Sequence, residues 1–520
     1  RMNNREDTSN GGKSEKNDAS GGKYEDNNLG KKCGWESGPE AAHHAHFLRA
    51  VLDLLVEKAV FQGTDRSSKV VEWVEPSELQ QRLQLDLGDD GVTQGDLLRH
   101  LDQVVRYSVK TGHPYFINQL FSSLDVYGLV GQWVTDALNP SVYTYEVSPV
   151  FTLMEIKVLS AMADLVGYKE HDGLFCPGGS ISNMYGMLLA RYHHCPDVKK
   201  RGLHGLGHQL VVLTSADSHY SLLKSAMTLG LGADNLLPVD VDEAGRMDVG
   251  HLRQRIKSAR EEGAVPFMVC ATAGTTVLGA YDPLDAVAEV CGDESLWLHV
   301  DAAWGGGALL SSRHKHKLLG IHRADSVTWN PHKLLASPQQ CSVFLTSHPG
   351  LLDACNSASA NYLFQKDKFY DTSYDVGDKH LQCGRRVDVL KFWTMWKAKG
   401  TTGLEKHVER VFEMSQLFAD KIRFREGFKL LLEPECTNVC FWYEPPSLRT
   451  KRAHPEYNKL LNAVAPKIKE RMVKTGSMMI TYQPLRGQPN FFRLVLQNSQ
   501  VNEHDINYFI AQIEHLGRDL

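Results

Sequence analysis

Residues 330–333 (Asn-Pro-His-Lys) carry the side chains best suited to covalent chemistry, and they follow the apolar stretch 326–329. A proline fixes the turn, and a lysine just beyond a buried strand can lose its hydration and become nucleophilic. By itself the tetrapeptide is equally compatible with an ordinary turn that ends in a surface lysine. The residues that accompany it decide between a surface lysine and one that binds a carbonyl group.

An acid stands at the end of another expected strand. Asp301 follows the apolar stretch 296–300 and precedes small residues, and ligands of α/β proteins collect at the carboxyl ends of strands. A turn or a helix cap would explain a lone aspartate more simply. Enzymes that use pyridoxal phosphate (PLP), however, pair a carboxylate with the pyridine nitrogen of the cofactor and a lysine with its aldehyde. Asp301 and Lys333 together therefore predict PLP.

A glycine turn and a histidine add to this prediction. Residues 177–183 (Pro-Gly-Gly-Ser-Ile-Ser-Asn) precede a helix-like run, so backbone N–H groups and the helix N-terminus could hold a phosphate. The turn matches neither glycine motif of nucleotide-binding proteins, and a simple helix cap remains an alternative. His219 lies in a strand-to-helix turn, where its ring could stack on a planar cofactor, although most histidines have no such role.

The elements that position these residues form an α/β pattern. Between about 111 and 362, strands alternate with helices, which predicts a largely parallel sheet covered on both faces. The strand candidates there are 210–215, 266–273, 296–303, 325–330 and 341–346. A helical run at 389–424, with a break at Gly400, precedes strand candidates at 428–432, 438–443, 477–482 and 490–496. We expect a disordered tail (1–40), an N-terminal helical segment (41–110), a PLP-binding large domain (111–388) and a small α+β C-terminal domain (389–520).

Composition excludes several classes of function. The chain has 520 residues, 42% of them hydrophobic, and a net charge of -5, so we expect neither nucleic-acid nor membrane binding. Ten cysteines without a Cys-x-x-Cys pair indicate reduced thiols and a cytoplasmic protein. His43, His44 and His46 have no cysteine or acid at ligand spacing, so we expect no metal site.

The chain resembles the group II PLP-dependent amino-acid decarboxylases, in the branch that holds glutamate, cysteine sulfinate and aspartate 1-decarboxylases. The resemblance extends from about Val51 to Leu520. Its motifs include 108–114, 118–120, 144–147, 271–276, 330–333, 362–365 and 490–493. It implies the fold of PLP-dependent transferases (fold type I), with a mainly parallel seven-stranded sheet. It also implies a homodimer with the active site at the subunit interface.

The resemblance also implies the residues that act on the cofactor. The catalytic residues would be Lys333, Tyr370, His219 and Asp301. The cofactor-binding residues would be Lys333, Asp301, Ala303, His219, Gly179, Ser180, Thr276, Asn330 and His332. The segment 365–377 would be a mobile lid, from which Tyr370 protonates the substrate carbon after decarboxylation.

The substrate is expected to be a small acidic amino acid. By resemblance, Arg493 binds a carboxylate of the substrate, for which a planar guanidinium is well shaped, and Asn118, Gln119 and Phe121 line the same pocket. Glutamate decarboxylases have serine where this chain has Phe121, so the aromatic ring should shorten the pocket. Residues 132–138 and 337–341 look most like insect-type aspartate 1-decarboxylases.

We therefore expect decarboxylation of L-aspartate to β-alanine first. Cysteine sulfinate decarboxylation, which gives hypotaurine for taurine synthesis, is the second expectation, and glutamate decarboxylation, which gives GABA, is the third. An aminotransferase would use the same lysine and aspartate, and a non-catalytic homologue would be expected to lose Lys333 or Tyr370.

Overall fold

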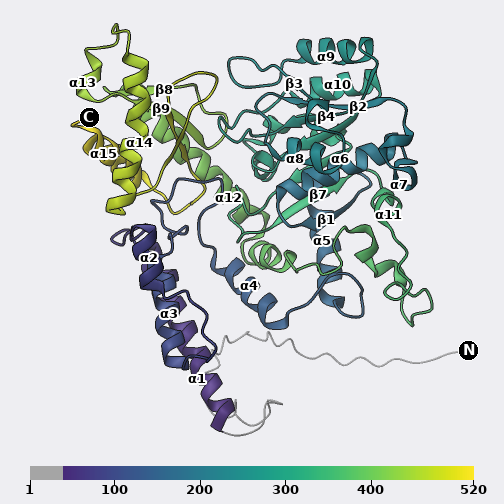
Figure 1. Ribbon diagram of the computed structural model, residues 1–520, viewed down its shortest axis with the longest axis horizontal. Coiled ribbons are helices and arrows are strands. Elements are labelled where there is room, and N and C mark those ends of the chain that lie inside the picture. The colour runs from purple at the N-terminus through teal and green to yellow at the C-terminus, as the bar shows by residue number, and fades with distance from the viewer. Residues whose placement is uncertain (1–38) are drawn as a thin grey trace, which may run out of the picture.

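The computed structural model describes residues 39–520. Three parts stand out in Figure 1: a large domain, a smaller C-terminal domain beside it, and an arm of N-terminal helices that extends away from both. The expected disordered tail lies outside the described residues except for its last two positions, 39 and 40. The domain boundaries near 110 and 388 stay predictions.

The arm is helical, as the periodicity of residues 41–108 predicts. It consists of α1 (Pro39–Leu54), a π-helix η1 (Leu55–Gln62), α2 (Pro76–Leu83) and α3 (Gln94–Tyr107). Thr93 begins α3, because its hydroxyl accepts the Asp96 N–H at 3.1 Å. An ion pair of 2.6 Å between Lys58 of η1 and Asp102 of α3 joins these two helices. The Val70 N–H donates to the Gly476 carbonyl at 2.9 Å and so ties the arm to the C-terminal domain.

The large domain is built on the seven-stranded sheet that the resemblance implies. The strands are β1 (Asp172–Cys176), β2 (Gln209–Ser215), β3 (Leu236–Val239), β4 (Ala264–Thr272), β5 (Trp297–Asp301), β6 (Ser326–Trp329) and β7 (Ser342–Thr346). Their order is β1-β7-β6-β5-β4-β2-β3, and only β7 runs antiparallel to its neighbours. The sequence pattern did not predict β1 and β3. Both are edge strands; β1 contains Gly173, which weakens a strand, and β3 contains Pro238, which a central strand rarely tolerates.

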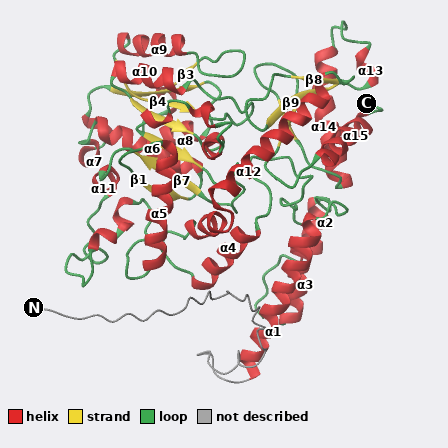
Figure 2. Cartoon of the chain, turned by 180° about the vertical axis from the view of Figure 1, so that it is seen from behind, coloured by secondary structure: helices red, strands yellow, loops and turns green. Residues whose placement is uncertain are grey.

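Helices cover both faces of this sheet (Figures 1 and 2). They are α5 (Pro149–Val166), α6 (Gly179–His194), α8 (Ser221–Thr228), α9 (Val249–Glu261) and α10 (Leu284–Glu294). α4 (Val126–Leu138) packs against the later helix at residues 389–423, α7 (Val198–Arg201) lies beside residues 203–205, and α11 (Leu351–Asn356) packs on α6. Side chains of β4 alternate between the two layers: Cys270 packs with α6 and α8, whereas Val269 and Ala271 pack with α5, α9 and α10. Both layers are apolar, which explains why the central strands read as continuous hydrophobic runs.

The C-terminal domain is α+β, as expected. It begins with α12 (Val389–Arg423), whose helical geometry is interrupted at Gly400 (φ 66°, ψ 173°). A four-stranded antiparallel sheet follows, in the order β10 (Thr481–Gln483), β11 (Phe491–Val495), β9 (Asn438–Tyr443) and β8 (Phe428–Leu430). The helices are α13 (Pro446–Arg449), α14 (Tyr457–Thr475) and α15 (Glu503–Gly517). The strand expected at 477–482 starts only at Thr481, because Met479 pairs instead with the segment 115–117.

Short 3₁₀ helices fill several connections. They are η2 (Leu203–Gly205), η3 (Ala233–Asn235), η4 (Gly305–Leu310), η5 (Lys315–Leu318), η6 (Ile321–Arg323), η7 (Thr372–Tyr374) and η8 (Val376–Lys379). Within residues 39–520, no helix has both the length and the apolar character needed to span a bilayer.

Candidate active site

The residues expected to do chemistry converge at one edge of the seven-stranded sheet. β1, β2, β4, β5 and β6 run in the same direction, so their carboxyl ends meet there. They surround a cavity of about 240 Å³. The expected cofactor-binding residues that line it are Gly179, Ser180, His219, Thr276, Asp301, Ala303, Asn330, His332 and Lys333.

Lys333 lies in the turn after β6, where its backbone N–H donates to the Asn330 carbonyl at 3.0 Å. Burial lowers the pKa of the Lys333 amine, the Asp301 carboxylate raises it, and the Arg493 guanidinium lowers it. The net effect is a lowered pKa. A larger fraction of the amine is then neutral, which is the form that attacks an aldehyde.

Asp301 is buried at the end of β5, with 4% of its surface exposed. One carboxylate oxygen accepts the Ala303 backbone N–H at 3.0 Å, and the other accepts Nδ2 of Asn183 at 2.9 Å. Two donors therefore fix the plane of the carboxylate. A buried carboxylate that is held in this way can hydrogen-bond a protonated pyridine nitrogen and favour its cationic form.

Asn183 is itself oriented by a buried histidine. Its Oδ1 lies 3.0 Å from Nε2 of His299, whose Nδ1 lies 2.8 Å from the Ser326 hydroxyl. Burial lowers the pKa of His299 to about 4, so the ring is neutral near pH 7. With Nε2 as donor to Asn183, the amide must direct its NH₂ group toward Asp301.

A close contact shapes the glycine turn at the start of α6. Gly178 has a φ of +93°, a conformation that glycine adopts at little cost. A Cβ on Gly179 would lie only 2.7 Å from Nδ2 of Asn330. Asn330 cannot move away freely, because its Oδ1 accepts the Ser342 hydroxyl at 2.6 Å. The turn, the Asn330 amide and the helix N-terminus together suit a phosphate.

Two histidines border the cavity. Nδ1 of His219 lies 2.8 Å from the Ser221 hydroxyl, which holds the ring in one orientation. Burial lowers the pKa of His219, while Asp301 acts in the opposite direction. Nδ1 of His332 lies 2.6 Å from the Cys341 carbonyl, and burial lowers the pKa of His332 to about 4. Both rings can therefore contact a flat cofactor without adding a full positive charge.

This arrangement fits PLP. A lysine for the aldehyde, a fixed carboxylate for the pyridine nitrogen, and a glycine turn for the phosphate lie around one cavity. His219 and Ala303 border the same space, as the resemblance implies for two cofactor-binding residues.

None of the expected substrate residues lines this cavity; Asn118 and Gln119 lie where their segment meets the C-terminal domain. Arg493 is buried in β11, and its Nη1 donates to the Thr276 carbonyl at 2.7 Å. Its Nη2 makes a long contact of 3.5 Å with the Asn118 carbonyl, and its Nε has no hydrogen-bond partner within the described residues. Phe121 is half-buried, whereas Gln119 is exposed. Arg493 thus retains donor capacity for an acid.

Tyr370 is not among the residues that line the cavity of its own chain. Its hydroxyl donates to Asp375 at 2.9 Å, and the Lys368 amine lies 5.5 Å from the centre of its ring. The adjacent Phe369 is 97% exposed. The structure therefore places this segment on the surface, and the catalytic role of Tyr370 stays a prediction.

Comparison with known proteins identifies the family. Residues 76–444 match the model of the pyridoxal-dependent decarboxylase conserved domain. The chain belongs to the pyridoxal-dependent decarboxylase family.

The decarboxylase also has close relatives. It is 54% identical to the acidic amino acid decarboxylase GADL1 of Mus musculus over 475 residues, which cover 91% of this chain and 86% of the relative. It is 54% identical to the cysteine sulfinic acid decarboxylase of Homo sapiens over 474 residues, which cover 91% of this chain and 96% of the relative. The crystal structure of mouse CSAD matches with a TM-score of 0.90 and 51% identity, covering 92% of this chain and 100% of that one. These matches confirm the expected family, fold, cofactor and enzyme class, and they favour a decarboxylase over an aminotransferase or a non-catalytic homologue.

Asn183, which lines the cavity, and Lys469, which contacts the expected substrate residue Asn118, were not expected as site residues. Asn183 ends the glycine motif 177–183, and its place one turn into α6 is a signal that it faces the same cavity. Lys469 of α14 donates to Oδ1 of Asn118, and burial lowers its pKa to about 8. No sequence signal marks Lys469, because it approaches Asn118 from a distant part of the chain.

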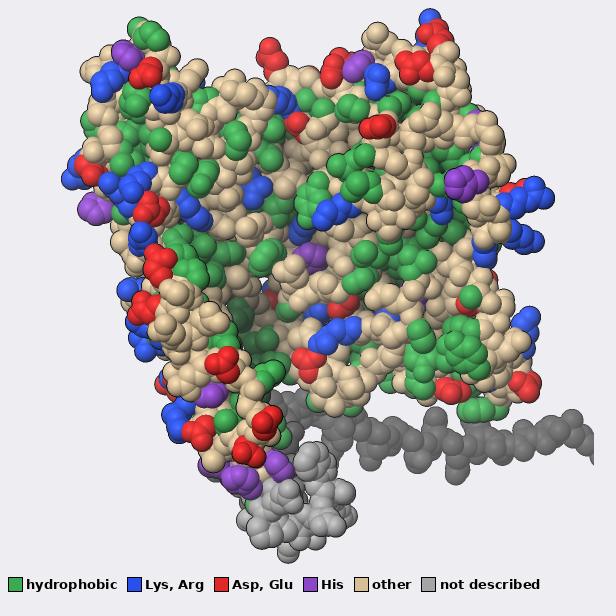
Figure 3. All heavy atoms as spheres, in the orientation of Figure 1, with side chains coloured by type: hydrophobic (Ala, Val, Ile, Leu, Met, Phe, Trp, Pro, Cys, Tyr) green, Lys and Arg blue, Asp and Glu red, His purple; other side chains and the backbone are tan. Residues whose placement is uncertain are grey.

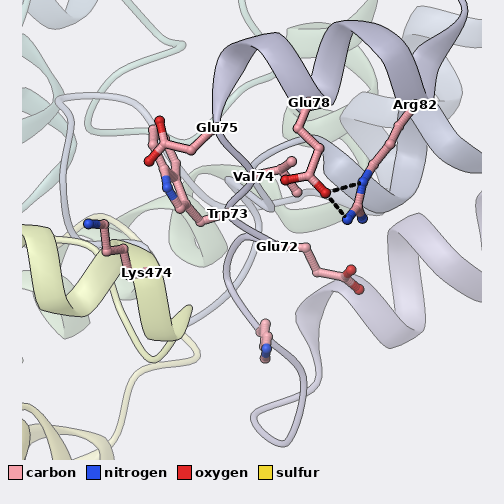
Figure 4. Close-up of a pocket in the computed structure, with 8 residues that line it drawn as sticks. Glu72, Trp73, Val74, Glu75, Glu78, Arg82 and Lys474 are labelled. Atoms are coloured by element: carbon pink, nitrogen blue, oxygen red, sulfur yellow. Dashed lines mark hydrogen bonds and ion pairs between the residues drawn. The ribbon is translucent and has the colours of Figure 1, made fainter.

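A second hollow of the decarboxylase lies between the arm and the C-terminal domain (Figure 4). It is lined by Lys69, Glu72, Trp73, Val74, Glu75, Glu78, Arg82 and Lys474. Several of its charged groups already have partners: Nε of Arg82 donates to Glu78 at 3.1 Å, and Glu72 and Lys474 pair with Arg106 and Glu470. None of the expected site residues borders it, so the cavity at Lys333 is the candidate active site.

Proposed function

We propose that this enzyme decarboxylates short acidic amino acids, with cysteine sulfinate as the leading substrate and aspartate as the second. The observation that carries the proposal is Arg493, a buried guanidinium whose Nε has no partner among residues 39–520 and which is close enough to Lys333 to affect its pKa. Such a group binds the acid of a substrate side chain with high selectivity.

The names of the relatives change the expected order of substrates. Aspartate is the first expectation from the sequence, but the similar proteins are called cysteine sulfinic acid decarboxylase or acidic amino acid decarboxylase GADL1, and neither name specifies aspartate. Cysteine sulfinate is therefore better supported than aspartate as the substrate, and its product would be hypotaurine. The half-buried Phe121, whose ring lies 6.3 Å from that of Phe116, still argues against the longer glutamate.

The roles of the side chains follow from their positions. PLP, when bound, accepts the electron pair that the departing carbon dioxide leaves behind. Lys333 would hold the cofactor until substrate arrives, and Asp301, fixed by Asn183, would keep the pyridine nitrogen protonated. Arg493 would orient the side-chain acid of the substrate. The α-carboxylate would then lie away from the guanidinium. A positive charge close to this carboxylate would stabilise it and so oppose the loss of carbon dioxide.

We also propose that the enzyme is a cytoplasmic homodimer. Apolar side chains recur every four residues on one side of α4, at Val126, Val130, Val134 and Leu138, and each is more than 40% exposed. More apolar side chains are exposed on α1 and α5, and Figure 3 shows hydrophobic patches on the arm and the lower part of the large domain. A second copy would bury them. The absence of disulfides among the nine described cysteines is compatible with a reducing compartment.

A dimer would also supply a place for Tyr370. The lid segment 365–377 does not reach the cavity of its own chain, so we propose that it acts at the cavity of the partner subunit. The active site would then lie at the subunit interface.

The substrate proposal is tested by measuring carbon dioxide release from cysteine sulfinate, aspartate and glutamate side by side. The wild type should prefer the two short acids, and Phe121→Ser should shift the ratio of kcat/KM values toward glutamate by about 10-fold or more. Light scattering after size-exclusion chromatography should give twice the chain mass. Glutamate as the best wild-type substrate would refute the pocket argument, and a monomeric active enzyme would refute the interface.

A further inference from the structure

Two histidines and a cysteine meet at the edge of the sheet opposite the cofactor cavity. α6 ends at His194, Cys195 follows directly, and His208 precedes the first residue of β2. One nitrogen of each imidazole and the Cys195 sulfur all lie within 4.8 Å of one another. No other group of this kind occurs within residues 39–520.

We propose that His194, Cys195 and His208 bind a thiophilic divalent cation of the zinc class. Imidazole and thiolate are the ligands that Zn²⁺ prefers, and three protein ligands with one open position form a common tetrahedral site. In such a site the ligand atoms are about 3.3–3.6 Å apart, as follows from Zn–N and Zn–S bond lengths. The three side chains need to approach by roughly 1 Å, which rotation of the exposed His194 and His208 side chains supplies.

The donor atoms are available for a metal. Within the described residues, no hydrogen bond or ion pair involves the ring nitrogens of His194 or His208, or the Cys195 sulfur. His194 and His208 are exposed and Cys195 is half-buried, so a cation could enter from solvent and keep a water molecule as its fourth ligand. The C-terminal end of a helix carries partial negative charge, which also favours a cation at the end of α6.

The site would have a structural effect. Twelve residues separate Cys195 from His208, and this connection includes α7, at the right edge of the large domain in Figure 1. A metal would close the connection at its two ends, binding the end of α6 to the start of β2. α6 has 16 residues, so the proposed metal lies about 24 Å from the glycine turn that begins the helix. Direct participation in decarboxylation is therefore excluded.

The test uses the full-length PLP enzyme without a polyhistidine tag, after treatment with a chelator. Zn²⁺ is titrated in competition with a coloured zinc indicator, and Co²⁺ is used to detect sulfur-to-metal charge transfer in the near ultraviolet. Cys195→Ser and His208→Gln are compared with two matched controls. These are Cys383→Ser, which removes an exposed thiol elsewhere, and His204→Gln, which removes an exposed histidine of the same connection.

The wild type and both controls should bind one more Zn²⁺ per chain than Cys195→Ser and His208→Gln. In those two variants the affinity at this site should fall by about 100-fold, because one of three protein ligands is lost. The cobalt charge-transfer band should disappear in Cys195→Ser alone, with decarboxylation unchanged. Equal zinc stoichiometry and affinity in the wild type and Cys195→Ser would overturn the proposal, as would a charge-transfer band that survives in Cys195→Ser. Should either variant fail to fold, the other decides the result.

Discussion

Adding one methyl group to the glycine turn should weaken cofactor binding. In Gly179→Ala, the new Cβ would lie 2.7 Å from Nδ2 of Asn330 and 3.2 Å from its Oδ1. An ordinary contact is about 3.4 Å, so one partner must move by about 0.7 Å. The φ of Gly179 is not positive, so alanine suits the backbone and the contact alone causes the effect.

The side chain of Asn330 cannot easily move away from the new methyl group. It is 2% exposed, and its Oδ1 accepts the Ser342 hydroxyl, which lies 2.8 Å from the Ser182 hydroxyl. Turning the amide leaves buried polar groups unsatisfied, which costs about 1–3 kcal/mol. Displacing the start of α6 instead would misplace the N–H groups for the phosphate. We therefore expect the Kd for PLP to rise by about 5- to 150-fold.

The assay is an equilibrium titration of the apoenzyme with PLP, followed by the absorbance of the bound cofactor. Gly292→Ala is the matched control, because nothing lies within 4 Å of a Cβ at that position and alanine suits its helix. Gly292→Ala should bind PLP as the wild type does. If Gly179→Ala also binds PLP with wild-type affinity while its apoenzyme is equally stable, the close approach is not required and the account of the phosphate site is wrong.

Three further predictions concern titratable groups. Lys333→Ala should lower kcat by several orders of magnitude and abolish the absorbance of the covalently held cofactor, and wild-type turnover with an unchanged spectrum would contradict the role of this lysine. Burial lowers the pKa of His299, His332 and His407 to about 4 from an unfolded value near 6.5. Below about pH 6.5 the unfolded chain binds more protons than the folded chain. The free energy of unfolding should therefore be highest above that pH and fall as the pH drops toward 4. Urea unfolding of the holoenzyme at pH 7.5 and 5.0 should show this loss, and equal midpoints would refute it. Lys469, with a pKa lowered to about 8 by burial, is charged below that pH and neutral above it. KM for an acidic substrate should rise above pH 8 in the wild type but not in Lys469→Met, and parallel pH profiles would exclude Lys469 from the substrate site.

Several features were predictable because they depend on local sequence. Apolar stretches end at Asp301 and at residue 329, and a glycine turn precedes a helix. Alternation of strands and helices then requires a parallel sheet, and the carboxyl ends of its strands meet at one edge. The position of Lys333 beside Asp301 therefore follows from the order of elements. The family motifs added the identity of the reaction, which periodicity cannot supply.

Other features depend on contacts between distant segments. The edge strands β1, which contains Gly173, and β3, which contains Pro238, lack a clear strand pattern, and they are strands because β7 and β2 supply hydrogen bonds to them. Arg493 meets Thr276 and Asn118 only because the C-terminal sheet packs against two earlier parts of the chain.

The sequence by itself determined which residues stand at the ends of strands, and so it determined the cofactor chemistry. Only the tertiary structure decided that Asn183 orients Asp301, that Tyr370 lies outside the cavity of its own chain, and that His208 returns to Cys195. The physical reason is that burial preferences and turn geometry are properties of neighbouring residues. The direction of a buried amide, the reach of a loop and the meeting of donor atoms are set by packing between segments far apart in the chain.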